Sequence, residues 1–273
     1  MNVTRRFRGV ATVGLFLTII SNAYAKYSGG TGEPNDPYQI ATAVDLIALG
    51  EDANDYDKHF ILTADIDLDP NLPGGKVFDK AVIAPAADLE RGEMMGVPFA
   101  GVFDGNDHTV SHLTITGVTH LGLFGSLASG AEVRRLGIVD VGIAGSGSDL
   151  GGLVGFNDQG RVTGCYSTGS VSGTGDDVAG LVGNNSYGDV TRCFSTCTVQ
   201  SLGEGAWAVG VLVGNNSGRV AQCQSTGTVT GLGDRAYAVG GLVGSNGWGH
   251  VIACYSTCVL SGNTRVGGLV GDN

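Results

Sequence analysis

Three aspartates alternate with apolar residues near the start of the chain, at Asp65, Asp67 and Asp69. Asn71 follows two positions later, and carboxylate and amide oxygens are the ligands that Ca²⁺ prefers in proteins. The EF-hand pattern is not met, because Pro70 replaces the loop glycine and Lys76 replaces the bidentate glutamate. The three aspartates are therefore a calcium candidate, and the alternative is the solvent-exposed face of a strand.

The chain has six cysteines, at Cys165, Cys193, Cys197, Cys223, Cys254 and Cys258. Two cysteines four residues apart on a strand would be separated by about 13 Å, too far to share a zinc ion. Cysteines stacked on neighbouring repeats would instead come within the Cα separation of a disulfide, about 4.4–6.8 Å. The alternative, which we favour, is a column of buried thiols that act as small apolar side chains.

Two pairs of aromatic residues occupy matching positions in neighbouring repeats. Trp207 and Tyr237 each precede a repeated leucine by five residues, and Tyr166 and Phe194 each follow a repeated cysteine. Stacked exposed rings can bind the faces of sugars, and they can also simply cover a strand. These four aromatic residues are the predicted ligand-binding positions.

Acidic residues gather at one predicted corner of the repeats, at Asp149, Asp176, Asp177, Glu204 and Asp234. Glycoside hydrolysis requires two carboxylates that face one groove. Because these acids do not hold one register, we interpret them as solvating charges.

The sequence offers no residues for a catalytic or cofactor-binding role. H-E-x-x-H and G-x-x-x-x-G-K-[ST] are both absent, and nothing marks a Ser/His/Asp triad. His108 and His112 are four residues apart, which would form a metal pair only on a helix, and their surroundings are strand-like. Calcium is therefore the one cofactor under consideration.

The composition favours short strands and tight turns as the elements that position these residues. Glycine makes up 48 of 273 residues, and all six prolines lie before residue 99. So many glycines would destabilise helices, and the absence of proline from the second half suits uninterrupted strand pairing. With 42% hydrophobic and 15% charged residues, the chain is also unlike a disordered one.

A repeat of 27 to 31 residues runs through the second half of the chain. A G-x-L-V-G-like signature recurs with its leucine at Leu123, Leu153, Leu181, Leu212, Leu242 and Leu269. An asparagine follows four residues later, at Asn157, Asn185, Asn216, Asn246 and Asn273. A valine comes next, and then a cysteine at Cys165, Cys193, Cys223 and Cys254. This period, with its three apolar runs and glycine corners, suits one coil of a parallel β-solenoid.

The predicted fold class is all-β, a parallel β-helix of about seven to eight coils. Equivalent residues should stack about 4.8 Å apart along the axis. Alternation within the cysteine strand predicts that Cys165 and Val171 point inward, while Tyr166 and Ser170 point outward. The asparagine column should lie at a corner, where each amide can satisfy turn backbone and stack on its neighbours.

Residues 151–157, Gly-Gly-Leu-Val-Gly-Phe-Asn, followed by Val162 and by Cys-Tyr-Ser-Thr-Gly at 165–169, resemble the GLUG repeat. The resemblance is specific over 151–273 and looser over 98–150. That repeat occurs in bacterial secreted and surface proteins, including adhesin-like proteins and some immunoglobulin A-cleaving metallopeptidases. The resemblance implies a right-handed β-helix outside the cytoplasm and, because the repeat is a scaffold, no activity.

The domain organisation follows from these patterns. Residues 1–25 resemble a secretory signal peptide that ends at Ala-Tyr-Ala, and 26–59 form an N-terminal cap. Within this cap a helix is predicted from Ala43 to Leu49, begun by a Thr42–Asp45 capping box and ended by Gly50. Residues 60–150 form irregular first coils with a loop at 70–97 outside the coil, and 151–273 form the GLUG-type repeats.

The charge excludes one class of partner and leaves others open. The formal net charge is −11, and residues 26–110 alone account for −11, so nucleic acid is not an expected partner. We expect a secreted or cell-surface, non-enzymatic scaffold or adhesin-like binding module that does not stay in a membrane after signal cleavage. Its partners would be extracellular polysaccharide or a host or surface protein. The alternatives are a carbohydrate-active β-helix enzyme of the polysaccharide lyase or glycoside hydrolase type, with acids in a groove around 65–107, or a bare structural spacer.

The sequence also stops a few residues into a coil, at Gly-Asp-Asn. An uncovered coil presents unpaired backbone groups. We therefore expect either that the natural chain continues or that this end associates edge to edge with another chain.

Overall fold

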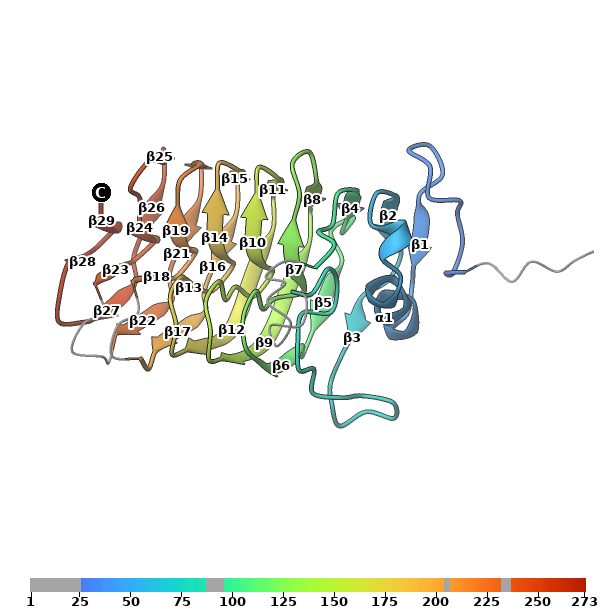
Figure 1. Cartoon of the computed structure of the whole chain (residues 1–273), viewed down its shortest axis with the longest axis horizontal. Coiled ribbons are helices and arrows are strands. Elements are labelled where there is room, and N and C mark those ends of the chain that lie inside the picture. The colour runs from blue at the N-terminus through green and yellow to red at the C-terminus, as the bar shows by residue number, and fades with distance from the viewer. Residues whose placement is uncertain (1–25, 87–95, 204–206, 232–236) are drawn as a thin grey trace, which may run out of the picture.

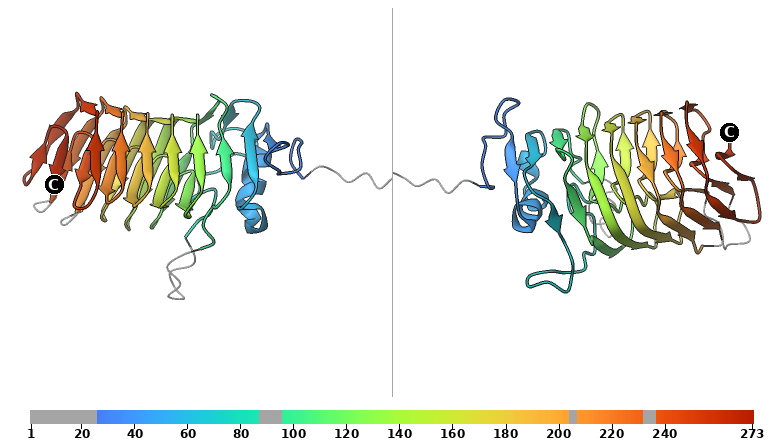
Figure 2. Two further views of the ribbon diagram at one scale, coloured as in Figure 1. Left: turned by 90° about the horizontal axis from the view of Figure 1, so that it is seen from above. Right: turned by 180° about the vertical axis from the view of Figure 1, so that it is seen from behind.

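The structure, a computed structural model, describes residues 26–86, 96–203, 207–231 and 237–273. The predicted signal peptide, Glu204 and Asp234 lie outside these ranges. The described chain is an elongated β-solenoid whose named strands pair in parallel from coil to coil (Figure 1). Figure 2 shows the coils stacked along one axis, with the N-terminal segment at one end and the C-terminus at the other.

Four sheets form the walls of the solenoid, and one coil of the repeat region passes through sheets 4, 2, 1 and 3 in that order. Sheet 1 contains β1 (Tyr38–Ile40), β2 (His59–Leu62), β4 (Val102–Asp104), β8 (Glu132–Arg134), β11 (Arg161–Thr163), β15 (Asp189–Thr191), β20 (Arg219–Ala221) and β25 (His250–Ile252). Sheet 2 contains β7 (Phe124–Leu127), β10 (Val154–Asp158), β14 (Val182–Ser186), β19 (Val213–Asn216), β24 (Val243–Ser245) and β29 (Val270–Asp272).

The other two sheets complete the coil. Sheet 3 contains β3 (Ile66–Asp67), β5 (Thr109–Ser111), β6 (Thr114–Gly117), β9 (Gly137–Gly145), β12 (Tyr166–Gly173), β16 (Phe194–Ser195), β17 (Thr198–Ser201), β21 (Gln224–Ser225), β22 (Thr228–Gly231), β26 (Tyr255–Ser256) and β27 (Val259–Ser261). Sheet 4 contains β13 (Val178–Ala179), β18 (Ala208–Gly210), β23 (Ala238–Gly240) and β28 (Val266–Gly267).

The all-β solenoid is confirmed, but it makes about five turns rather than seven to eight. The six strands of sheet 2 are separated by five turns of the chain. The first strands of sheet 1, β1 and β2, stack on the solenoid without partners in sheet 2, because the chain around them forms the helix and loops of the cap. The predicted number of coils is therefore too high, because not every early apolar run forms a coil of its own.

The core is built from inward columns that repeat from coil to coil. Leu153, Leu181, Leu212 and Leu242 are all fully buried, and each backbone N–H donates to the carbonyl of the next leucine in the column. Cys165 and Val171 are buried while Tyr166 and Ser170 are not, as the alternation predicts. In the last coil the equivalent side chains, such as Val251 and Leu269, are only half-buried.

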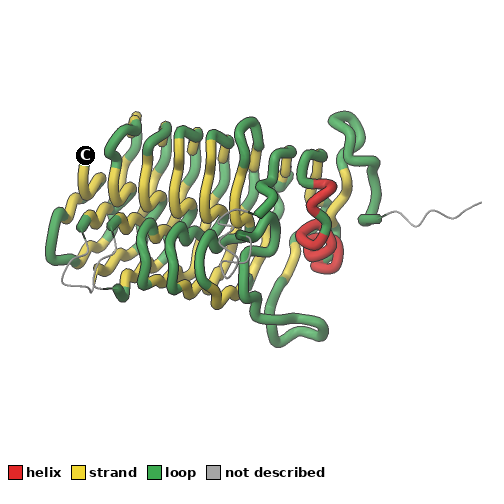
Figure 3. Tube along the Cα trace, viewed as in Figure 1, coloured by secondary structure: helices red, strands yellow, loops and turns green. Residues whose placement is uncertain are grey.

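The cap contains the one α-helix of the described residues, α1 (Ala43–Glu51), followed by a short 3₁₀ helix (Ala53–Asp55) (Figure 3). The predicted capping box is present, since the Asp45 N–H donates to Thr42 Oγ1 and the Thr42 N–H donates to the Asp45 carboxylate. The helix runs past Gly50, which was expected to end it. Gly50 instead permits close packing, because a Cβ there would lie 1.9 Å from the Val82 carbonyl oxygen.

The segment after the cap differs from the predicted loop at 70–97. Residues 78–84 do not lie outside the coil: Phe78 and Ile83 are buried and form isolated parallel bridges to Ile115 and Phe124. A chain of phenylalanine rings fills the core beside them, with centroids 5.2 Å apart for Phe99 and Phe124. Residues 78–84 cover an apolar cross-section that the first coils leave open.

Candidate functional site

The asparagine column lies at the corner between sheets 2 and 1, as predicted; we call Asn157, Asn185, Asn216 and Asn246 the amide corner. Each Nδ2 donates to the Oδ1 of the asparagine in the next coil at 2.7 Å, and the last of these bonds reaches Asn273. Each Nδ2 also donates to a glycine carbonyl two or three residues on, as Asn185 does to Gly188 at 3.0 Å. A Cβ at Gly188 would lie 2.1 Å from Asn157 Nδ2, so the turn requires glycine.

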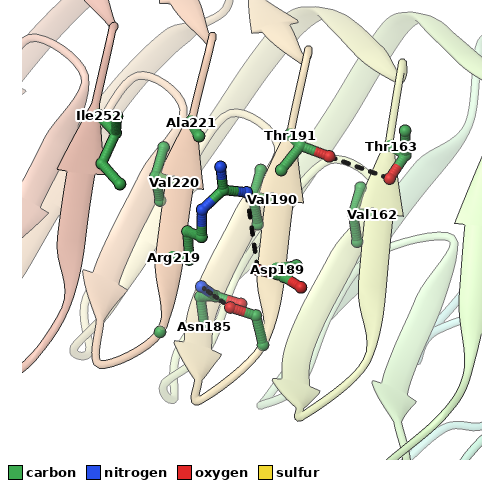
Figure 4. A network of polar contacts seen from close by, with 12 residues as sticks. Val162, Thr163, Asn185, Asp189, Val190, Thr191, Arg219, Val220, Ala221 and Ile252 are labelled. Carbon is green, nitrogen blue, oxygen red and sulfur yellow. Dashed lines mark hydrogen bonds and ion pairs between the residues drawn. The ribbon is translucent and has the colours of Figure 1, made fainter.

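Figure 4 shows how the amide corner adjoins the outer face of sheet 1. Outward charges alternate there, with Asp189 pairing in register with Arg161 on one side and Arg219 on the other. Thr163 and Thr191 share a hydrogen bond of 3.1 Å between their hydroxyl groups. This face satisfies its own polar groups across coils.

The cysteine column is also present, and its thiols are free. The backbone N–H groups of Cys165, Cys193 and Cys223 each donate to the Sγ of the cysteine in the next coil at 3.4 Å. Burial is the main cause that raises the pKa of Cys193, and hydrogen bonding with Cys193 raises the pKa of Cys223 to about 12. The column therefore consists of protonated thiols that fill space inside the corner.

Both predicted aromatic pairs are stacked. The Tyr166 and Phe194 ring centroids are 4.8 Å apart with planes at 1°, and those of Trp207 and Tyr237 are 5.0 Å apart at 11°. Trp207 and Tyr237 are 46% and 39% exposed.

Their stacking changes what the rings can bind. The facing sides of each pair cover one another, the Arg265 guanidinium lies 5.2 Å from the Tyr237 centroid, and Tyr166 covers Gly137. Sugar rings bind to free aromatic faces, and the stacking leaves only the outer faces of each pair for such a contact. The main role of the aromatic pairs is therefore packing between neighbouring coils.

One group of polar residues was not predicted. His120, Asp149 and Asp177 form a single column just before sheet 4, which we call the carboxyl corner, because Leu121, Leu150 and Val178 pair in register. His120 Nε2 lies 2.9 Å from Asp149 Oδ2, and Asn184 Nδ2 donates to Asp177 Oδ2 at 2.9 Å. The expectation that the corner acids hold no common register is therefore wrong for Asp149 and Asp177.

The same two acids are also not solvating charges, since only 9% of Asp149 and 7% of Asp177 is exposed. Burial, and then the neighbouring Asp149 carboxylate, raise the pKa of Asp177 to about 8. The two residues are neighbours in the column, since Leu150 and Val178 pair in register. At neutral pH the Asp177 carboxyl group is therefore protonated and uncharged.

The sequence did contain a signal for this corner. Asp149 and Asp177 each stand four residues before the repeated leucine, whereas Asp176 stands five before it. All three carboxyl-corner residues adopt left-handed backbone angles, with φ of 49°, 63° and 57° for His120, Asp149 and Asp177. Aspartate and histidine tolerate that conformation better than most residues, which helps to explain their place at a tight turn.

The structure does not bring the three calcium candidates together. Asp65 Oδ1 lies 3.1 Å from His108 Nδ1, and Asp67 Oδ1 lies 2.8 Å from His112 Nδ1. Asp69 turns to the backbone N–H of Asn71 at 2.8 Å. Each carboxylate is thus engaged separately along an outward strand face. Within the described ranges no three His, Cys, Asp or Glu side chains are grouped closely enough to hold a metal ion.

A groove with a volume of about 670 Å³ lies between α1 and residues 76–85. Its lining carries both signs of charge, including Glu51, Lys76, Asp79 and Lys80. Asp65 and Asp67, the strand carboxylates around which a sugar-processing groove was considered, do not line it. In the part of the chain that the structure describes, no helix has the length and apolar character needed to cross a membrane.

Comparison with known proteins supports the repeat assignment. The family model described as the GLUG motif matches residues 146–172 and 205–230, so the chain contains GLUG repeats. Halomucin from Haloquadratum walsbyi is 32% identical over 149 residues. Those residues are 52% of this chain and 2% of that protein, so the chain spans only a small part of its relative.

A solved structure shares the fold. The crystal structure of a putative immunoglobulin A1 protease from Bacteroides ovatus matches with a TM-score of 0.61. The match covers 88% of this chain and 80% of that chain at 19% identity. Such a likeness shows a common solenoid and does not extend to activity.

Proposed function

We propose that this GLUG-repeat chain is a secreted or cell-surface scaffold module that has no catalytic activity of its own. The observation that carries the proposal is the set of continuous buried columns: leucine, amide and thiol ladders run through the GLUG coils. Such ladders hold each coil in register with the next and make a stiff rod. On sheet 1 the outward residues vary between coils while these columns persist, as the register of Arg161, Asp189 and Arg219 shows.

Two further observations support this function. The similarity to halomucin favours an extracellular setting, because mucins are extracellular proteins. The two acids of the carboxyl corner are buried, with 9% of Asp149 and 7% of Asp177 exposed. Retaining glycoside hydrolysis needs carboxyl groups about 5 Å apart with sugar between them. The carboxyl corner leaves no such space.

The experiment is cell fractionation of a bacterial host that expresses the full chain with a C-terminal tag. We expect a mature form beginning at Lys26 outside the cytoplasm, and an uncleaved form in the membrane fraction for the variant Ala23→Arg/Ala25→Arg. The purified chain should also leave acidic polysaccharides intact. Release of reducing ends or unsaturated sugars would overturn the scaffold in favour of an enzyme, and a cytoplasmic wild-type chain would overturn the location.

A second candidate function, adhesin-like binding of polysaccharide or a surface protein, rests on the exposure of Trp207 and Tyr237 next to Arg265. The test is a glycan array with Trp207→Ala/Tyr237→Ala, and Tyr166→Ala/Phe194→Ala as the matched stacked pair. Loss of a signal in the first variant alone would support binding at this position. An equal loss in both variants would assign the effect to the weakened solenoid.

A further inference from the structure

The outer face of sheet 3 carries hydroxyl side chains at most of its outward positions in four successive coils. After the outward column of Tyr166, Phe194, Gln224 and Tyr255, the remaining outward positions are 168, 170 and 172; 196, 198 and 200; 226, 228 and 230; and 257, 259 and 261, which we call the hydroxyl face. Ten of the twelve are threonine or serine, and the other two are Gln200 and Val259. None is charged, in a chain with 26 acidic residues. This uniformity sets the face apart from sheet 1, where outward charges alternate.

Strand pairing arranges these side chains as a two-dimensional grid. Ser170, Thr198, Thr228 and Val259 form one column in register, and Ser172, Gln200, Thr230 and Ser261 form the next. Neighbours are about 4.8 Å apart along the axis and about 6.7 Å apart along each strand. Figure 1 shows β12, β17, β22 and β27 side by side along one wall of the solenoid. Side-chain ladders such as those inside this solenoid are what keeps a many-stranded sheet flat.

Most hydroxyl groups of this grid have no protein partner. Thr168 Oγ1 accepts from the Asp140 N–H, and Ser172 Oγ donates to the Ile143 carbonyl. The other eight hydroxyl side chains of the face make no side-chain hydrogen bond within the described chain. Inward hydroxyl groups of the same strands behave differently, as Ser225 Oγ donates to the Gly241 carbonyl at 2.7 Å. The outward grid is free to bond to something outside the protein.

The chemistry of the grid selects its ligand. Each threonine offers a hydroxyl that both donates and accepts, beside a methyl group that water does not bond. A flat, uncharged, periodic array of such groups has no pocket for a soluble sugar and no charge for a polymer. It matches a solid surface whose own oxygen atoms repeat at similar distances in two directions. Ice is such a solid, and it needs donors and acceptors but no charge. We propose that the hydroxyl face binds the surface of ice crystals.

The proposal does not depend on the scaffold function, because it concerns one face of the folded chain. The first experiment is slow freezing of a solution of the purified full chain onto a cooled probe. We expect the protein to enter the growing ice, whereas a non-binding control such as serum albumin stays in the liquid. A second readout is recrystallisation, in which ice grains should stay small with the wild-type chain present. Exclusion of the wild-type chain from ice would overturn the proposal whatever the variants do.

Two matched double variants locate the surface. Thr198→Tyr/Thr228→Tyr places two rings in the grid, and Thr163→Tyr/Thr191→Tyr makes the same change at in-register threonines of sheet 1. We expect the first variant to be lost from the ice fraction and the second to remain at the wild-type level, with equal melting temperatures by circular dichroism. Equal loss in both variants would contradict the assignment to this face. Retention on insoluble cellulose or chitin, abolished by the first variant, would show that the ligand is a polysaccharide lattice and the proposal of ice wrong.

Discussion

The amide corner and the carboxyl corner lie on the same coils, and both are buried, yet they satisfy their polar groups in different ways. An asparagine amide is both donor and acceptor, so each one bonds to the next at 2.7 Å and the ladder can continue through any number of coils. An ionised aspartate is only an acceptor. Asp149 and Asp177 therefore stack with a proton on Asp177, with His120 beside Asp149 and with Asn184 as a donor to Asp177.

The difference explains how far each column extends. The amide column continues for as many coils as the GLUG repeats do, with its one unpaired end at Asn157 Oδ1, where the preceding coil has Leu127. The carboxyl column stops after Asp177, and alanines occupy the same register in the next two coils, at Ala208 and Ala238. A side chain that both donates and accepts can be repeated from coil to coil, whereas a side chain that only accepts needs donors from other residues.

Converting the amide corner into a carboxyl corner should have the largest effect. Asn185→Asp places a carboxylate between Asn157 and Asn216, removes the donor to Asn216 and leaves a buried charge without a cation. We expect a loss of about 3–5 kcal/mol in the free energy of unfolding at pH 7, measured by urea titration. Gln222→Glu, an exposed change of the same kind, is the control. Equal stability of the two variants would mean that the amide ladder contributes little.

The reverse change should stabilise the carboxyl corner. Because the folded pKa of Asp177, about 8, lies above its model value of 3.8, the unfolded chain gives up this proton at lower pH than the folded chain does. The contribution of this group to stability is therefore complete below about pH 4 and is lost as the pH rises to about 8. Asp177→Asn mimics the protonated form and should remove this decline.

The measurement is the melting temperature at pH 5 and pH 8 for the wild type, Asp177→Asn and the control Asp158→Asn. A gain of about 1 kcal/mol corresponds to about 2–4 °C in a chain of this size. We expect at least that gain for Asp177→Asn at pH 8 and a smaller one at pH 5. If the melting temperature of the wild type did not decrease from pH 5 to pH 8, this would count against a protonated Asp177 at neutral pH.

The smallest effect should come from the exposed aromatic pair. Trp207→Ala removes stacking with Tyr237 at a half-exposed position, and we expect a loss of about 0.5–1.5 kcal/mol. Urea titration would measure it beside Leu212→Ala, a fully buried change in the same coil that should cost about 2–5 kcal/mol. If Trp207→Ala lowered the free energy of unfolding as much as Leu212→Ala does, the buried columns and the exposed residues would not contribute separately to stability.

The parts of the fold that repeat could be predicted from the sequence, and the parts that occur once could not. The leucine, asparagine and cysteine columns follow from a fixed period, because stacking puts every equivalent residue in the same place. One close contact, between Gly50 of the cap and Val82, accompanies the burial of residues 78–84 and the extension of α1 past Gly50. A repeat period does not predict a contact that occurs only once.

The candidate site shows the same limit. The stacking of Trp207 on Tyr237 was predicted from their matching positions, but not the covering of their ring faces, which depends on side-chain orientation. Asp149 and Asp177 were judged together with Asp176, Glu204 and Asp234, and their common register was hidden by acids that do not share it. Their partner His120 stands three rather than four residues before its leucine, so simple counting would also have missed it.

The central claim is that one GLUG coil is a complete unit whose inward columns carry the fold, and removal of a single coil tests it most directly. Deletion of residues 182–212 joins Leu181 to Val213 and brings Asn216 into the place of Asn185, so every column can close again. Deletion of 182–211 differs by one residue and turns the following side chains to the opposite face. Small-angle X-ray scattering should show the first variant folded and shorter by one rung, about 4.8 Å, and the second unfolded or aggregated. Equal behaviour of the two deletions, whether both fold or both fail, would contradict the claim.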